Sequence, residues 1–152
     1  MSKDIYIDSN IFISVFLERP GSEGIVEFFE EGVRGLDLRF CTSEWTLTEV
    51  VKVLINEYKI DSERVAAYVE ELIRVKRVCG VKFSFVEVSP VEGYDFREFF
   101  YDVQKTVLEY RNGVPDAIHS SIMRNNGIDM ILTSDAGFEG IEGIEVLNPL
   151  RG

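Results

Sequence analysis

Apolar runs and amphipathic stretches alternate along this chain. Short runs rich in β-branched and aromatic residues predict five strands, at 4–8, 36–41, 83–88, 130–133 and 144–147. Apolar residues spaced three or four apart predict helices at 11–17, 25–31, 44–58, 61–78, 94–110 and 115–125. Because strands and helices alternate, the pattern predicts an α/β fold, with a mostly parallel five-stranded sheet that helices cover on both faces.

The composition fits one domain spanning residues 1–152. Hydrophobic residues make up 45% of the chain, and no linker, low-complexity tract or repeat interrupts it. No apolar run reaches the length that spans a bilayer, so no membrane association is expected. The N-terminus has neither the apolar core nor the small-residue cleavage site of a signal peptide. We therefore expect a soluble, cytoplasmic protein.

The formal net charge of -11 argues against nonspecific nucleic-acid binding, which depends on Lys and Arg neutralising phosphates. It does not exclude an enzyme that meets phosphates through metal ions, because bound divalent cations reverse the local field. The densest basic cluster consists of Arg74, Lys76, Arg77 and Lys82. We interpret this cluster as the solvated end of a helix, with a nucleic-acid contact as the alternative.

The cysteines and the histidine narrow the chemistry further. Cys41 and Cys79 are not in a metal-binding spacing and lie among apolar residues, so we expect reduced, buried thiols. His119 is the only histidine, which excludes any site built on several histidines. We interpret it as an interfacial histidine with its hydrogen bonds satisfied, and a hydrogen bond to a nearby carboxylate is the alternative.

Two acids follow predicted strands. Asp8 ends the first strand and precedes a helix, where its alternative role is that of an N-cap. Asp135 follows the strand at 130–133, where its alternative role is to form a turn. Ligands of open parallel sheets bind outside the carboxyl ends of the strands. Both acids therefore lie at the edge where chemistry is expected.

Two further acids lie on predicted helices. Glu49 points away from the main apolar stripe of its helix, but Trp45 and Val53 lie one turn to either side and partly desolvate its carboxylate. The alternative is an ordinary exposed glutamate paired with a lysine. Asp116 lies in the first turn of its helix, where the helix dipole favours an anion.

These four acids carry more weight together than singly, because two end strands at one edge and two lie on helices that abut that edge. Clustered carboxylates repel one another unless cations lie between them. Oxygen ligands suit Mg²⁺ or Mn²⁺ rather than zinc. Two such ions, about 3.5–4 Å apart, activate water and stabilise an in-line displacement at phosphorus.

Four short motifs in this order resemble the signature of PIN-domain nucleases, and the chain is similar in size to the single-domain VapC-type ribonuclease toxins. The motifs are Asp8-Ser9-Asn10, Thr46-Leu47-Thr48-Glu49-Val50, Pro115-Asp116-Ala117-Ile118-His119 and Thr133-Ser134-Asp135-Ala136-Gly137-Phe138. The order and the spacing of the motifs match across essentially the whole chain.

The resemblance implies a PIN-like three-layer sandwich and an endoribonuclease that cleaves RNA phosphodiester bonds with Mg²⁺ or Mn²⁺ as cofactor. It implies a homodimer and, if the protein is the toxin of a toxin–antitoxin pair, an antitoxin as partner. The catalytic, metal-binding acids that it implies are Asp8, Glu49, Asp116 and Asp135, with Asn10 and Thr133 as supporting residues.

Two other enzyme classes fit the sequence less well, and one binding function is a serious alternative. A haloacid-dehalogenase-like phosphatase also has an Asp after its first strand, but it needs a second Asp two residues on, where this chain has Asn10. The sequence fits a dinucleotide-binding oxidoreductase even less well, because no GxGxxG motif follows residues 5–8. The serious alternative is a PIN-fold binding or scaffold module with little or no nuclease activity, which acts through protein partners.

Overall fold

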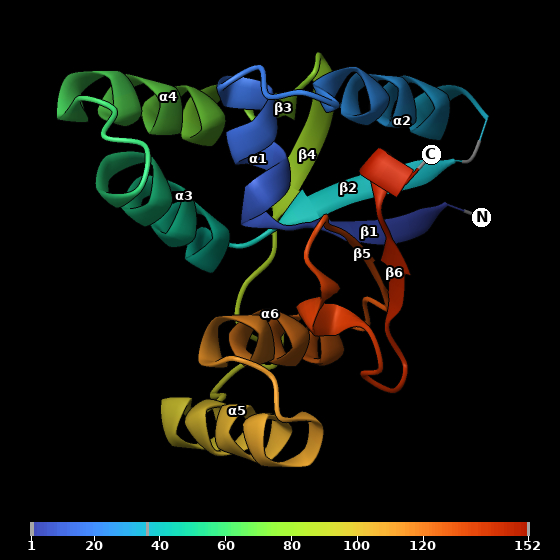
Figure 1. The fold of residues 1–152 in the computed structure, drawn as a ribbon. Coiled ribbons are helices and arrows are strands. Elements are labelled where there is room, and N and C mark those ends of the chain that lie inside the picture. Colours follow the sequence, from blue (N-terminus) through green and yellow to red (C-terminus); the bar gives the residue numbers. More distant parts are fainter. Residues whose placement is uncertain (1, 36, 152) are drawn as a thin grey trace.

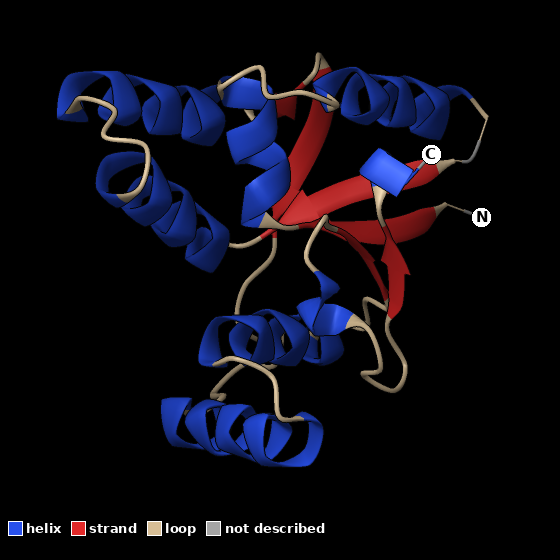
Figure 2. Ribbon diagram, in the orientation of Figure 1, coloured by secondary structure: helices blue, strands red, loops and turns tan. Residues whose placement is uncertain are grey.

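The computed structural model describes residues 2–35 and 37–151 and has one mixed sheet at its centre (Figures 1 and 2). The order of its strands is β3-β4-β2-β1-β5-β6. All neighbouring pairs are parallel except β3 and β4. The strands are β1 (Lys3–Ile7), β2 (Leu38–Thr42), β3 (Arg77–Val78), β4 (Val81–Phe85), β5 (Met130–Leu132) and β6 (Glu145–Leu147).

Helices cover both faces of this sheet, as the sequence predicted. In Figure 1, α1 to α4 lie on one face, and α6 lies between the other face and α5. None of the helices within the described ranges is long and apolar enough to cross a membrane. The helices are α1 (Ser9–Phe16), α2 (Ser22–Arg34), α3 (Glu44–Asn56), α4 (Ser62–Val75), α5 (Phe96–Tyr110) and α6 (Val114–Asn125), with short 3-10 turns η1 (Ala136–Phe138) and η2 (Pro149–Arg151).

The alternation of side chains along β1 divides the interior into two cores. Ile5 and Ile7 belong to the core beneath α1 to α4, whereas Tyr6 belongs to the core beneath α6. All three side chains are fully buried. Successive side chains of a strand point to opposite faces, so a central parallel strand must be apolar on both. Tyr6 therefore brings a hydroxyl group into the core beneath α6.

The sheet has six strands rather than the five predicted. The extra strand, β3, occupies the end of the helix that we predicted to continue to residue 78. That helix stops at Val75, because Lys76 adopts a left-handed conformation with φ of 56°. Cys79 and Gly80, both with positive φ, then join β3 to β4 as a two-residue hairpin turn. The hairpin adds the only antiparallel pair among the described strands.

Other predicted boundaries shift by a few residues. The second strand was expected from residue 36, which lies outside the described residues, and it runs from Leu38 to Thr42. The strand predicted at 83–88 covers Val81–Phe85. Of the two free cysteines, Cys41 is buried as expected, but Cys79 in the hairpin is only partly buried.

The strand order reverses at β1, since β2 pairs with one side of it and β5 with the other. In open parallel sheets, the crevice at such a reversal is where ligands bind. The residues that follow β1 and β5 begin with Asp8 and Thr133. The fold thus brings two of the predicted motifs to one edge of the sheet.

A substitution of Phe29 tests the packing of the larger core. It is fully buried in α2, and its ring centroid lies 4.7 Å from that of Phe40 on β2. Phe29→Ala should lower the free energy of unfolding by about 3–5 kcal/mol, because it removes packed apolar area and leaves a cavity. Chemical denaturation followed by circular dichroism measures this loss. The matched control is Phe100→Ala on α5, where the side chain is 55% exposed, and it should change stability by about 1 kcal/mol or less. Equal losses in the two variants would contradict the assigned core.

Candidate functional site

Asp8 is the most heavily bonded of the four predicted acids. It caps α1 directly after β1 and is 4% exposed. Its Oδ1 accepts a hydrogen bond from the Ser9 backbone N–H at 2.7 Å. Its Oδ2 accepts from Thr133 Oγ1 at 2.7 Å and from Asn10 Nδ2 at 3.2 Å. Burial raises the pKa of Asp8, while His119 and the Thr133 hydroxyl oppose that rise. The N-cap role and a place in the site are therefore compatible.

Asn10 and Thr133 join the turn after β1 to the turn after β5. Asn10 Nδ2 donates to Thr133 Oγ1 at 3.0 Å, and Asn10 Oδ1 accepts from the Ser134 N–H at 3.2 Å. Thr133 Oγ1 also accepts from the Asp135 N–H at 3.0 Å. The two side chains predicted to support the site thus hold Asp8 and the backbone of Asp135 in one network.

Asp116 and Asp135 face the same spot, the backbone of Gly137. A Cβ atom added to Gly137 would lie 2.1 Å from Asp116 Oδ2 and 3.4 Å from Asp135 Oδ1. Asp135 Oδ1 also accepts the Gly137 N–H at 2.9 Å, so Asp135 forms the predicted turn as well. A side chain at this position would therefore displace the Asp116 carboxylate. Both carboxylates lie next to Gly137.

Burial and the charges of the other three acids raise the pKa of Asp116. Burial of Asp116 raises its pKa, the nearby carboxylates of Asp135, Asp8 and Glu49 raise it further, and His119 lowers it. The resulting pKa of Asp116 is about 7. The structure thus brings all four acids close enough to influence one another at one edge of the sheet.

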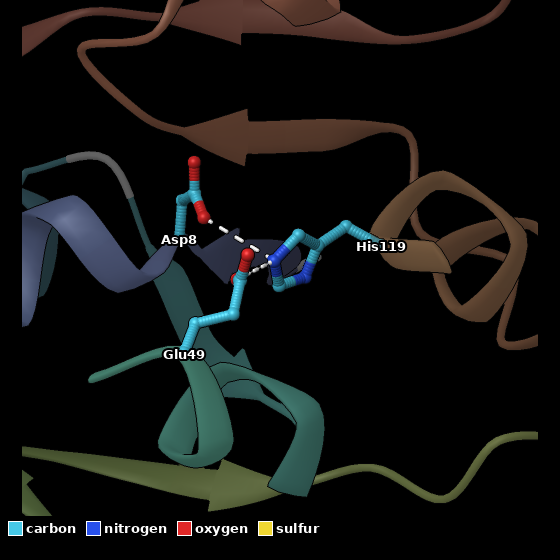
Figure 3. Close-up of side chains that lie close together, drawn as sticks. All are labelled: Asp8, Glu49 and His119. Carbon is cyan, nitrogen blue, oxygen red and sulfur yellow. Dashed lines mark hydrogen bonds and ion pairs between the residues drawn. The ribbon is translucent and has the colours of Figure 1, made fainter. Parts of the chain in front are cut away.

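Glu49 reaches this edge from α3 through His119. Figure 3 shows Asp8, Glu49 and His119 pointing toward one another from three different elements. His119 Nε2 makes a short hydrogen bond with Glu49 Oε1 and lies 3.4 Å from Asp8 Oδ1. Each of these three residues offers one potential metal-ligand atom, and the three atoms all lie within 4.8 Å of one another. Among the described residues, no other group of three or more Asp, Glu, His or Cys side chains comes this close together.

His119 acts in this arrangement as a donor rather than as a metal ligand. Burial of the ring lowers the pKa of His119, but the carboxylates of Glu49 and Asp8 more than offset this and raise it above its usual value. Because a carboxylate oxygen accepts hydrogen bonds, Nε2 donates its N–H to Glu49 Oε1. A ring nitrogen that carries a hydrogen atom cannot bind a metal ion, so the carboxylate oxygens are the ligand atoms that this arrangement leaves.

Tyr6 lies on the other side of His119. Its hydroxyl group is 2.7 Å from His119 Nδ1, 2.5 Å from Ser43 Oγ and 3.2 Å from Thr46 Oγ1. All four side chains are buried. Burial raises the pKa of Tyr6 far above its usual value, which keeps the phenol neutral. A hydrogen-bonded chain thus runs from the start of α3, through Tyr6 and His119, to the acids.

One interpretation of the sequence needs correction here. His119 was interpreted as an interfacial histidine, but it hydrogen-bonds Glu49, which was the alternative. Glu49 is partly buried as predicted, and its partner is this histidine rather than a lysine. Tyr6 was missed altogether. The available signal was a tyrosine inside an apolar strand, since a buried phenol usually has a hydrogen-bond partner.

The basic cluster lies away from the acids. Arg77 and Lys82 are exposed on β3 and at the amino end of β4, whereas the acids follow the carboxyl ends of β1 and β5. Arg74 pairs with Glu70 at 3.0 Å, and Arg77 donates to the Gly80 carbonyl at 2.9 Å. These contacts agree with the interpretation of the cluster as a solvated helix end.

Similar folds are known from bacterial toxin–antitoxin proteins. A DNA-bound VapBC from Salmonella typhimurium has a TM-score of 0.62 and 17% identity, over 98% of this chain and 99% of that chain. VapC20 from Mycobacterium tuberculosis, a toxin that cleaves the sarcin–ricin loop, has a TM-score of 0.62 and 14% identity, over 91% and 95%. VapBC2 from Rickettsia felis, bound to a DNA fragment from its promoter, has 0.62 and 12%, over 95% and 98%. At these identities, the likeness shows the fold alone.

The sequence also matches a known domain family. A search of curated proteins found no significant match. The family profile of the PIN domain, however, matches residues 5–144, which include all four acids and the elements that carry them. This chain belongs to the PIN domain family.

Proposed function

We propose that this protein is a metal-dependent ribonuclease that hydrolyses RNA phosphodiester bonds. The observation that carries the proposal is that four carboxylates lie near one another at one edge of the sheet, with His119 beside two of them. Membership of the PIN domain family supports a nuclease. The proposed catalytic and metal-binding residues are Asp8, Glu49, Asp116 and Asp135.

The four acids and their surroundings suit a hard divalent cation. The ligand atoms on offer are carboxylate oxygens, which suit Mg²⁺ or Mn²⁺. Gly137 leaves a space between Asp116 and Asp135 that a side chain would fill. Burial of Asp116 first, and then the nearby carboxylates of Asp135, Asp8 and Glu49, raise the pKa of Asp116 to about 7. A cation among the acids would offset the charge of these carboxylates.

The remaining residues of the site would prepare the acids for this task. Thr133 and Asn10 orient the Asp8 carboxylate through Oδ2. His119 holds Oε1 of Glu49. When bound, the ions lower the pKa of a water molecule and neutralise charge that develops at the phosphate. Because hydrogen bonds already hold the carboxylates of Asp8 and Glu49 in place, these side chains would need little reordering when substrate binds.

We further propose that the protein is the toxin of a toxin–antitoxin pair and acts as a homodimer in the cytoplasm. The support is the likeness of its fold to VapC proteins, some of them solved together with their antitoxins. Co-expression with the product of an adjacent gene tests this part of the proposal. A stable complex that no longer cleaves RNA would support it.

A PIN-fold binding or scaffold module with little activity remains the alternative function. The two proposals differ in what they require of the acids. Calorimetric titration with Mg²⁺ and Mn²⁺, combined with an RNA-pool cleavage assay, separates them. Absence of both metal binding and cleavage would favour the scaffold.

Asp8→Asn should reduce metal-dependent RNA cleavage by at least about 100-fold, since loss of a ligand should exceed the 10–100-fold effect of losing an outer partner. The fold should persist, because an asparagine oxygen can still cap α1. Cleavage of a labelled RNA pool with and without chelator provides the measurement. Asp129→Asn, an exposed residue paired with Lys3, is the matched control and should retain activity. Unchanged cleavage by the Asp8 variant would refute the proposal.

Asp116→Asn should stabilise the metal-free protein at pH 8. The pKa of Asp116 is raised, so the folded chain holds this proton up to about pH 7, whereas the unfolded chain releases it near pH 4. The stability that this group contributes is complete below pH 4 and is lost as the pH rises to 7. After allowance for solvent screening, the variant should gain roughly 1–2 kcal/mol at pH 8 in chelator.

Denaturation at pH 4 and pH 8 measures this effect, and Mn²⁺ adds a second arm. Mn²⁺ should stabilise the wild type at pH 8 much more than it stabilises the Asp116 variant, because the cation offsets the same repulsion. Asp129→Asn again serves as the control and should show neither change. A variant that is less stable than the wild type at pH 8 in chelator would contradict the assigned repulsion.

Gly137→Ala should weaken Mn²⁺ binding while every carboxylate remains in place. The new methyl group would lie 2.1 Å from Asp116 Oδ2, so the carboxylate must move. We expect at least about a tenfold rise in the dissociation constant, by analogy with the loss of outer-shell partners. Calorimetry gives the value. Gly113→Ala is the control, since its nearest neighbour would be Pro115 Cδ at an ordinary 3.7 Å. Equal affinities for the two variants would count against the shared spot.

A further inference from the structure

We propose that Tyr6 is a positioning residue of the site. Through its hydroxyl group, Tyr6 holds the His119 ring so that Nε2 faces Glu49 and Asp8, and it thereby sets the distance between these two acids. The inference deepens the proposed function and, for its effect on metal binding, rests on it. Tyr6 itself contacts neither Glu49 nor Asp8 in any hydrogen bond of the described residues, so it acts through His119.

The Tyr6 hydroxyl group is the centre of a fully buried network. It lies within hydrogen-bond distance of Ser43 Oγ, Thr46 Oγ1 and His119 Nδ1. Ser43 does not use its side chain to cap α3, although it occupies the N-cap position. Its hydroxyl group is instead committed to Tyr6. A favourable capping bond is thus given up for the network, which indicates that the network is the stronger constraint on Ser43.

The His119 ring is held from two further sides. The Tyr6 ring meets it edge-on, with centroids 5.4 Å apart and planes at 68°. The Phe138 ring lies 6.1 Å away at 56°. Phe138 follows Asp135 and Gly137 in η1, so the packing connects His119 to the segment that carries another acid. The ring therefore has little freedom to turn away from the carboxylates.

Glu49 depends most on this arrangement. It lies on a helix and has a long side chain with several rotatable bonds, whereas Asp8 accepts four hydrogen bonds from Ser9, Asn10 and Thr133. His119 binds Oε1 of Glu49, and Oε2 has no hydrogen-bond partner among residues 2–35 and 37–151. One oxygen is thus held while the other is free for a cation. Without His119 in place, Glu49 would regain its rotamer freedom.

The role of Tyr6 does not depend on whether Nδ1 of His119 carries a proton. A phenolic hydroxyl group can either donate to Nδ1 or accept from it. Ser43 and Thr46 can likewise act in either sense. The chain of contacts therefore keeps the His119 ring in position in either state. Positioning, rather than charge, is what Tyr6 supplies.

Tyr6→Phe tests the inference, because it removes the hydroxyl group and keeps the ring. The probe is Mn²⁺ alone, with affinity measured by calorimetry. We expect the dissociation constant for Mn²⁺ to rise by about 10-fold, within the range for outer-shell partners of metal ligands. Because His119 is the only histidine, its ring signals in nitrogen-15 NMR provide a second readout that needs neither metal nor activity. They should shift, and the ring N–H protons should exchange with water faster than in the wild type.

Tyr68→Phe is the matched control. Tyr68 is partly buried, and its hydroxyl group donates to the Phe12 carbonyl at 3.2 Å, in the other core. It should leave Mn²⁺ affinity and the histidine signals unchanged, even if the variant loses stability. Ser43→Ala is a second test variant in case Tyr6→Phe does not fold. It removes the shortest contact of the Tyr6 hydroxyl group and should act in the same direction.

The outcomes separate this inference from the proposed function. If the wild type binds Mn²⁺ and the two test variants retain both its affinity and its histidine signals, the inference is wrong and the proposed function stands. If the wild type binds no Mn²⁺, the proposed metal site is wrong. The histidine signals then decide the positioning role of Tyr6 by themselves.

Discussion

Electrostatic repulsion among four carboxylates is the constraint on which this structure depends. Asp8, Glu49, Asp116 and Asp135 come from four separate parts of the chain and meet at one edge of the sheet. Burial of Asp116 and, after it, the charges of the other three acids raise the pKa of Asp116 to about 7. An arrangement of this kind persists only if the rest of the fold holds the acids together or a cation offsets their charge.

The fold meets this constraint mainly through hydrogen bonds behind the acids. Thr133 and Asn10 join the turns after β1 and β5, so that Asp8 and the backbone of Asp135 cannot separate. On the other side, Tyr6 and His119 connect β1, α3 and α6. Both networks start from β1, the strand where the order reverses. This one strand therefore positions the site from both faces of the sheet.

The proposed function depends more on the arrangement of the four acids than on the likeness of the fold to other proteins. Similar structures share 12–17% identity with this chain in the three comparisons above, which is enough for a common fold and not for a common substrate. The net charge is -11, and Arg77 and Lys82 lie on β3 and at the amino end of β4, away from the acids. On the proposed function, cations held by the acids would therefore have to meet the phosphates of the RNA.

The sequence by itself determined the alternation of strands and helices, the parallel sheet and the positions of the four acids on their elements. These features depend on local periodicity and on short motifs, which a single chain displays directly. The β3–β4 hairpin was missed because Lys76, Cys79 and Gly80 adopt positive φ without a strong turn signature.

Only the tertiary structure decided that His119 bonds Glu49, 70 residues away, and that Tyr6 lies behind it. The same holds for the space at Gly137 that Asp116 and Asp135 share. Each of these contacts joins side chains from different elements. Whether two such groups meet depends on how helices pack against the sheet, and no periodicity along the chain records that distance.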